Sequence, residues 1–264
     1  MSLRRRLNGS RRSPLAATIV IAAGLLFSGG GFAVATSVVE SNVATAYTAD
    51  QIAEGKKLFL SNCASCHGLN SEGTKAGPSL IGVGAASVDF QVGSGRMPGQ
   101  GSGPQLPKKT VQFTEAQIEL MAAYVASLAP GPAIPDDKYL EATGDAAHGG
   151  ELFRINCAMC HNAVGAGGAL TEGKYAPVLK GVSAKHIYEA MVTGPQNMPV
   201  FNDSNLTPTD KQDIITYLAY MDENESAGGY ALASLGPVAE GLFIWIFGLG
   251  GIIAITVWLA AKSN

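Results

Sequence analysis

The sequence predicts an all-α protein in which two small tandem helical domains lie between two apolar helices. Three observations lead to this fold class: a duplicated segment, an amphipathic stretch that closes each copy, and an apolar run near each end of the chain. At 264 residues the chain is long for one domain and sufficient for two small ones with attachments. We divide it into a basic end with an apolar helix, a first domain, a linker, a second domain, a second linker and a transmembrane helix, at 1–40, 41–130, 131–146, 147–223, 224–236 and 237–261.

The amino-terminal segment has the pattern of an export signal. Five arginines, Arg4, Arg5, Arg6, Arg11 and Arg12, precede an uncharged apolar run from Leu15 to Val39. The run is longer than a typical cleavable signal and long enough to span a bilayer, which favours a retained signal anchor. Small residues at 44–46 would also suit cleavage, so a removed signal peptide is the alternative.

The carboxy-terminal run from Gly241 to Ala261 is 21 residues without a charge. As a helix it would be about 31 Å long, which matches the hydrocarbon core of a bilayer. Trp258 and Lys262 lie where an interfacial belt and a cytoplasmic charge are expected. The segment therefore predicts a transmembrane helix, with a buried core helix as the weaker alternative.

Composition and charge narrow the function classes. The net charge is −3 and charged residues make up 15% of the chain, so neither a disordered protein nor a basic nucleic-acid binder is indicated. Because arginine-rich ends stay in the cytoplasm, we expect both domains on the extracytoplasmic side of the cell membrane. Between residues 41 and 235 the excess acidic charge lies after residue 130, where 13 acidic residues face 6 basic ones.

An internal repeat organises the region between the apolar ends. The segment from Glu54 to Gly68 matches the segment from His148 to Asn162 at a constant offset of 94 residues. Each copy is followed by an amphipathic stretch with apolar residues at three- and four-residue steps, Thr114–Leu128 and Thr207–Met221. Thr114 and Thr207 are suitable N-caps. The repeat therefore predicts two related helical domains.

Each copy contains C-x-x-C-H, the attachment signature of c-type haem. The first is Cys63, Cys66 and His67, and the second is Cys157, Cys160 and His161. Two thiols on one helical turn can each form a thioether with a vinyl group, and the following histidine faces the iron as proximal ligand. A redox dithiol would not need the histidine, and a structural zinc site needs its second cysteine pair much closer than the 90 residues found here. The sequence therefore predicts two covalently bound haem c groups.

The distal iron ligands are expected later in each copy. Met97 lies 30 residues after His67, and Met198 lies 37 residues after His161. Both precede a proline, which holds the preceding residue extended. Met191 is the rival of Met198, while His148 and His186 suit surface or capping roles better than ligation. Histidine and methionine together fill both axial positions, which favours outer-sphere electron transfer and leaves no open site for catalysis.

With these motifs and the carboxy-terminal anchor, the chain resembles the dihaem cytochrome c subunit of actinobacterial cytochrome bcc complexes, the menaquinol–cytochrome c reductases. The resemblance implies two tandem class I cytochrome c domains and partnership with a cytochrome b subunit, a Rieske iron–sulfur subunit and a haem–copper oxidase in a supercomplex. It implies that electrons pass from the Rieske protein through both haems to the copper centre of the oxidase. In small haem c domains a backbone carbonyl often accepts a hydrogen bond from the proximal histidine, and Pro78 and Pro177 are the expected acceptors.

Three other functions fit the same motifs. The chain could be a dihaem subunit of another respiratory machine, such as a cbb-type oxidase or a membrane dehydrogenase. A membrane-tethered electron carrier without permanent partners is the second alternative. A dihaem peroxidase is the third, and it would require one iron with an open axial position.

Overall fold

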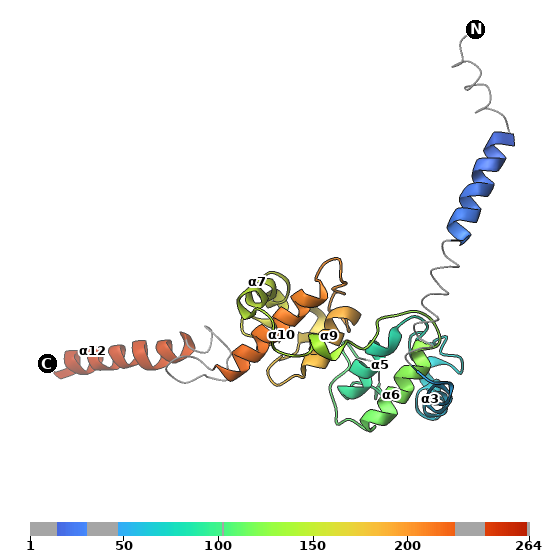
Figure 1. Ribbon diagram of the computed structural model, residues 1–264. Helices are drawn as coiled ribbons and strands as arrows, with labels where there is room; N and C mark the ends of the chain where they lie inside the picture. The colour runs from blue at the N-terminus through green and yellow to red at the C-terminus, as the bar shows by residue number, and fades with distance from the viewer. Residues whose placement is uncertain (1–14, 31–46, 102, 225–240, 263–264) are drawn as a thin grey trace, which may run out of the picture. The chain divides into compact units, whose positions relative to one another are not determined.

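The computed structural model describes residues 15–30, 47–101, 103–224 and 241–262 (Figure 1). The basic residues 1–14, the small-residue site at 44–46 and most of the predicted second linker at 224–236 lie outside the described residues. The regular secondary structure of the described chain is helical apart from one short antiparallel pair, in which Gly168 lies opposite Ala176; loops join the elements. Its elements are α3 (Ala49–Asn62), α4 (Ala64–His67), α5 (Gly84–Gly93), α6 (Glu115–Ala126), η1 (Asp137–Tyr139), α7 (Ala146–Asn156), α8 (Ala158–His161), β1 (Gly168–Ala169), η2 (Thr171–Gly173), β2 (Tyr175–Ala176), α9 (Ala184–Thr193), α10 (Pro208–Glu223), η4 (Ile244–Leu249) and α12 (Gly250–Lys262), besides an apolar helix at Leu15–Gly30.

The described residues form two compact units. The first lies within Met1–Gly84 and Glu119–Gly131, and the second lies within Ala85–Ile118 and Pro132–Asn264. Helix α5 and the loop after it, although they follow the first C-x-x-C-H motif, therefore belong to the unit that carries the second motif. The predicted linker also lies partly in this unit, where the Gln212 side chain of α10 donates to the carbonyl of Lys138 in η1 at 2.8 Å.

The two helices that close the repeats begin as the sequence predicts. The Thr114 hydroxyl accepts a hydrogen bond from the Gln117 amide at 3.3 Å, and Thr207 and Asp210 form a reciprocal capping box at the start of α10. Each closing helix crosses the helix before its haem motif at a glycine. A Cβ atom at Gly55 would lie 1.8 Å from the Leu120 carbonyl oxygen, and one at Gly149 would lie 1.9 Å from the Asp213 carbonyl oxygen. Only glycine permits these close crossings.

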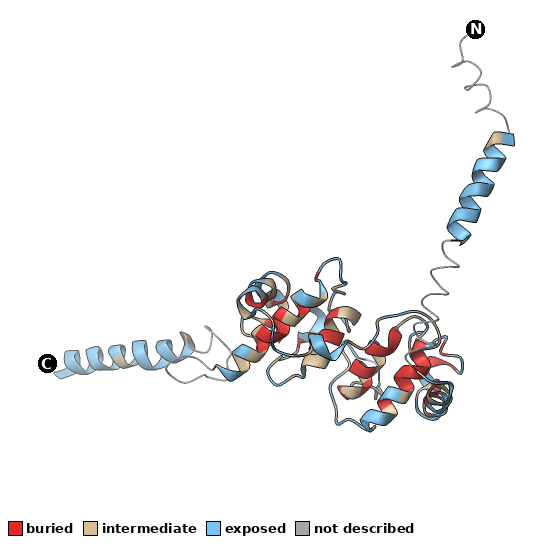
Figure 2. Ribbon diagram, viewed as in Figure 1, coloured by how far each residue is buried: buried red, intermediate tan, exposed pale blue. Residues whose placement is uncertain are grey.

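Each unit has its own hydrophobic core, shown in red in Figure 2. In the first unit the buried Phe59 of α3 packs against Tyr124 of α6, with ring centroids 5.1 Å apart. In the second unit Phe153 of α7, which is completely buried, packs against Tyr217 of α10 at 5.5 Å. These aromatic pairs occupy the same place in the repeat, since Phe59 and Phe153 both lie four residues before the first cysteine of their motif.

One described helix, Gly241–Lys262, is long and apolar enough to cross a membrane, with a mean hydropathy of 2.3 over its most apolar window. None of that window is buried against the rest of the described chain, as the exposed surface in Figure 2 shows. The buried-core alternative for this segment therefore has no support from packing. The amino-terminal apolar helix, Leu15–Gly30, is 16 residues long within the described range and is also exposed.

Candidate functional site

The second haem motif is built on a kink between α7 and α8. The Cys157 amide donates to the Phe153 carbonyl at 2.8 Å and ends α7, while the Cys157 carbonyl accepts from the His161 amide at 2.9 Å and begins α8. This single turn brings Cys157, Cys160 and His161 together. Asn162 then leaves the helix at a φ of 67°, in the left-handed region. The first motif repeats the geometry, with Cys63 at the kink and Gly68 at a φ of 84°.

The histidine of each C-x-x-C-H motif is held by a backbone carbonyl. The Nδ1 atom of His67 lies 2.7 Å from the Pro78 oxygen, and that of His161 lies 3.0 Å from the Pro177 oxygen. These contacts confirm the two prolines that the resemblance to small haem c domains suggested. A proton on Nδ1 leaves the lone pair on Nε2, which is the tautomer required of an iron ligand. Burial lowers the pKa of His161, partly offset by the Pro177 contact, and so favours its neutral form.

A cavity of about 290 Å³ opens beside the second motif. Its wall contains Cys157, Cys160, His161 and Met198, so the structure brings all four site residues predicted for this repeat to one space. Most of the remaining wall is apolar. It comes from the segment 170–182 and from α7, α9, α10 and the loop after α9, which contribute Phe153, Ile187, Pro199, Phe201 and Leu218. Such a lining suits a flat, mostly apolar macrocycle.

The rival distal ligand, Met191, also reaches this wall, but it is 2% exposed and belongs to the hydrophobic core with Phe153 and Ile214. Met198 lies in the loop after α9. Its amide donates to the Pro195 carbonyl at 3.0 Å, and the Phe201 amide donates to the Met191 carbonyl at 2.7 Å. The first bond closes a turn within the loop, and the second fastens the loop to α9 three residues after Met198.

Sequence reasoning did not find the part of the cavity wall that comes from residues 85–118. Phe90, Ser94, Arg96, Gln105 and Lys108 all line the cavity. The Gln105 side chain donates to the Tyr175 carbonyl at 2.9 Å and accepts from the Tyr175 amide at 2.8 Å, which fastens this loop to β2. No sequence pattern signals the contact, because its partners lie 70 residues apart.

The residues predicted for the first haem are divided between the compact units. Cys63, Cys66 and His67 lie in the first unit with Pro78, whereas Met97 lies in the second, in the loop after α5. The pairing of Met97 with the first motif therefore stays a prediction. The two histidines outside the motifs both contact carboxylates, His148 facing Asp213 at 2.8 Å and His186 facing Asp89 at 3.8 Å.

The donor set of the second site fits covalent haem better than a redox dithiol. Burial and, secondarily, the neighbouring Cys160 raise the pKa of the Cys157 thiol to about 11. Redox-active C-x-x-C pairs instead have a lowered cysteine pKa. A histidine with a free Nε2 and a methionine thioether on the same cavity are the axial groups of an electron-transfer haem.

Comparisons with known proteins agree with the two predicted haem domains. Residues 52–129 match the family model for cytochrome c, and residues 144–218 match the model for subunit III of cbb3-type cytochrome c oxidase. A cytochrome bc1 complex cytochrome c subunit from Corynebacterium efficiens is 45% identical, over 96% of this chain and 90% of the relative.

The protein of that name from Mycobacterium tuberculosis is 42% identical over 99% of this chain and 93% of the relative. The FixP subunit of a cbb3-type oxidase from Azorhizobium caulinodans is 30% identical over 63% of this chain and 58% of the relative. The relatives that match nearly the whole chain at above 40% identity are cytochrome bc1 complex cytochrome c subunits. The chain therefore belongs to the actinobacterial family of cytochrome bc1 complex cytochrome c subunits, and its role is haem-dependent electron transfer within that oxidoreductase complex.

Proposed function

We propose that this chain relays single electrons from a Rieske iron–sulfur protein towards the copper centre of a haem–copper oxidase. The observation that carries the proposal is the cavity on which Cys157, Cys160, His161 and Met198 converge. Membership of the bc1 cytochrome c subunit family supports the place of the relay in a quinol–cytochrome c reductase.

Two haem c groups are the cofactors that the paired motifs would hold. Cys63 and Cys66 would form the thioethers of the first haem, with His67 and Met97 as its axial ligands. Cys157 and Cys160 would serve the second, with His161 and Met198. Bound haem c supplies a one-electron iron couple.

The protein's own contribution is to hold these ligands and exclude other chemistry. The Pro177 carbonyl orients His161, and the bond from the Phe201 amide to the Met191 carbonyl holds the Met198 loop against α9 beside the cavity. If a histidine and a methionine hold each iron, neither haem would have an open axial position for a substrate. We infer that it transfers electrons without making or breaking bonds in a substrate.

The exposed helix Gly241–Lys262 supports attachment to the cell membrane, where a cytochrome b subunit and the Rieske subunit would be its permanent partners. The proposal places the haem domains on the extracytoplasmic side, and makes the chain multi-pass where the amino-terminal helix is retained. The acidic excess of the second domain would suit a basic surface on the oxidase, since complementary charge orients electron-transfer partners.

A second candidate function is supported by the match of residues 144–218 to a cbb3-type oxidase subunit. In that case the same two domains would serve an oxidase directly and no Rieske protein would be involved. The FixP relative covers less of this chain than the bc1 subunits do, so we rank this candidate second.

Purification of the tagged full-length chain in a mild detergent tests the proposal. We expect b-type and a-type haem bands beside the c-type band in the reduced-minus-oxidised spectrum, together with a Rieske protein in the eluate. A c-type band alone, from a monomer, would contradict the permanent complex and leave a tethered carrier. Co-purification of a cbb3-type oxidase without a Rieske protein would instead support the second candidate.

A further inference from the structure

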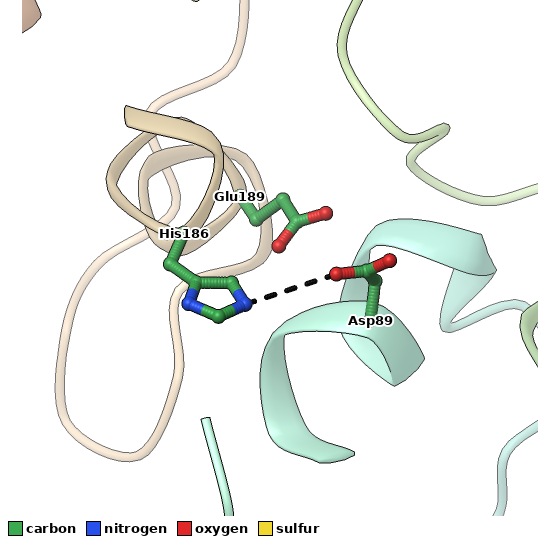
Figure 3. Close-up of side chains that lie close together, drawn as sticks. All are labelled: Asp89, His186 and Glu189. Carbon is green, nitrogen blue, oxygen red and sulfur yellow. Dashed lines mark ion pairs between the residues drawn. The ribbon is translucent and has the colours of Figure 1, made fainter. Parts of the chain in front are cut away.

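Three potential metal-binding side chains face one another between α5 and α9, within the second compact unit (Figure 3). Asp89 comes from α5, and His186 and Glu189 come from successive turns of α9. One ligand atom of each residue lies within 4.8 Å of the other two, and His186 Nε2 is 3.8 Å from Asp89 Oδ1. Asp89 and Glu189 are buried, and His186 is half-buried.

Glu189 is the unusual member of this group. Its side chain is fully buried at 0% exposure, yet neither carboxylate oxygen has a hydrogen-bond partner among the described residues. A buried carboxylate without a partner is costly, so such groups in native proteins are protonated, paired or bound to a metal. Burial and, secondarily, the charge of Asp89 raise the pKa of Glu189 to about 9.

The charges next to these three side chains determine whether the site can accept a cation. Lys185 forms an ion pair with Asp89 Oδ2 at 2.8 Å, which leaves Oδ1 of the same carboxylate directed towards His186. With Glu189 ionised, the two carboxylates exceed the charge of the contacting Lys185 by one, while Lys108 and Arg96 add positive charge around His186. Burial first, and then the positive charges of Lys185, Lys108 and Arg96, lower the pKa of His186 against the opposing effect of Asp89 and so favour the neutral imidazole that a metal requires.

A second carboxylate–histidine cluster in the described chain provides a comparison, because its buried carboxylate has hydrogen-bond partners. In the cluster of His148, Asp210 and Asp213, the buried Asp213 carboxylate accepts from the Asp145 amide at 2.7 Å and faces His148 at 2.8 Å. Both of its oxygens thus have protein partners. Glu189 has none in the described chain, and this difference distinguishes the two clusters.

From this arrangement we propose that Asp89, His186 and Glu189 bind one divalent transition-metal ion of the Zn²⁺ class, separate from the haem sites. Two carboxylate oxygens and an imidazole nitrogen form a donor set that such ions accept, with bond lengths of about 2.0–2.2 Å. Donors around a tetrahedral ion are then about 3.3 Å apart. The His186–Asp89 pair, at 3.8 Å, would close by about 0.5 Å, and no pair of ligand atoms is more than 4.8 Å apart before binding. Lys185 holds the outer oxygen of Asp89, as a neighbour that orients a ligating carboxylate.

The bound ion would fasten α5 to α9 beside the cavity, because His186 also lines the cavity wall.

The test uses the haem-loaded, full-length protein in detergent, treated first with a chelator. Titration calorimetry with Zn²⁺ should show one more equivalent for the wild type than for Glu189→Gln, or at least tenfold weaker binding in the variant. Added Zn²⁺ should also raise the thermal midpoint of the wild type and not that of Glu189→Gln.

Two further variants keep the test decisive. His186→Gln should lose the same equivalent, and it replaces Glu189→Gln if the latter does not keep a native haem spectrum. Asp210→Asn is the matched control in the other cluster and should retain the equivalent. Equal Zn²⁺ stoichiometry and affinity in the wild type and in both site variants would overturn the proposal and leave Glu189 a buried core residue without a metal.

Discussion

At the scale of single residues, each proximal histidine is oriented by a proline carbonyl rather than by a side chain. The contacts at Pro78 and Pro177 are short, at 2.7 and 3.0 Å, and occur at the same place in both repeats. A main-chain acceptor cannot be removed by a single side-chain substitution. The distal methionines have no such protection, so substitution there is the direct way to change each site.

Met198→Ala should lower the reduction potential of the second haem by on the order of 100 mV, because an axial thioether favours the reduced iron. Potentiometric titration followed by absorbance would measure the shift. The far-red sulfur-to-iron band should also decrease by about half, since one of two methionine ligands is lost. Met191→Leu is the control and should keep the band. Loss of the band in Met191→Leu, with Met198→Ala unchanged, would reverse the assignment.

A second prediction at this scale concerns His148 and pH. The hydrogen bond to Asp213, and then nearby acidic charges, raise the pKa of His148 above its value in the unfolded chain. The contact between protonated His148 and Asp213 therefore stabilises the fold below about pH 6.5. This stabilisation is lost as the pH rises through the raised pKa of His148. His148→Gln should lower the thermal midpoint by a few degrees at about pH 5.5 and by less at about pH 9. An equal effect at both pH values would show that the charge of His148 does not contribute.

At the scale of elements, the two glycine crossings fix how the haem-bearing helices pack. In Gly149→Ala the new Cβ meets backbone atoms of α10 at 1.9 Å, so α7 and α10 must separate. We expect a loss of about 1–3 kcal/mol or more in the free energy of unfolding, measured by denaturant titration. Gly150→Ala is the neighbouring control, because its Cβ would meet a side chain, the Tyr217 ring at 2.9 Å, rather than backbone, and it should therefore lose less stability. An equal loss in the control would contradict the crossing argument.

The same helices show which local features could be predicted. Thr114 and Thr207 were identifiable as caps because capping depends on residues three apart in sequence. Lys211 was not identifiable in the same way. It lies on amphipathic helix α10 yet is 0% exposed, donating to the Asp203 carboxylate at 2.7 Å and the Leu206 carbonyl at 2.6 Å. A lysine of this kind is predicted to be solvated, and only the loop folded over it reveals its role.

At the scale of the whole molecule, membrane attachment can be tested by truncation. A chain ending at residue 224 lacks the exposed helix Gly241–Lys262. Because we predict a retained signal anchor, this truncated protein should remain with the membrane after a carbonate wash, detected by its haem absorbance. Full-length protein is the control. Release of the truncated protein into the soluble fraction would show that the amino-terminal segment is removed.

The haem motifs, the duplication and the carboxy-terminal helix were all predictable, because each is a continuous pattern in sequence. The sequence did not indicate which residues belong to which compact unit. The wall of the cavity beside the second C-x-x-C-H motif includes Phe90, Arg96 and Gln105. These residues precede that motif by 50 residues or more. Contacts of this range depend on tertiary packing and leave no periodic signal.

The contribution of residues 85–118 to the cavity wall has a consequence for protein engineering. A fragment beginning at residue 144 would contain the cysteines, the histidine and Met198 of the second repeat, but it would lack Phe90, Arg96 and Gln105. Its cofactor would be more open to water, which stabilises the oxidised, more positive state and so lowers the midpoint potential. The second repeat alone is therefore poorly suited to transfer into a designed electron-transfer protein. A design that uses it should also include residues 85–118.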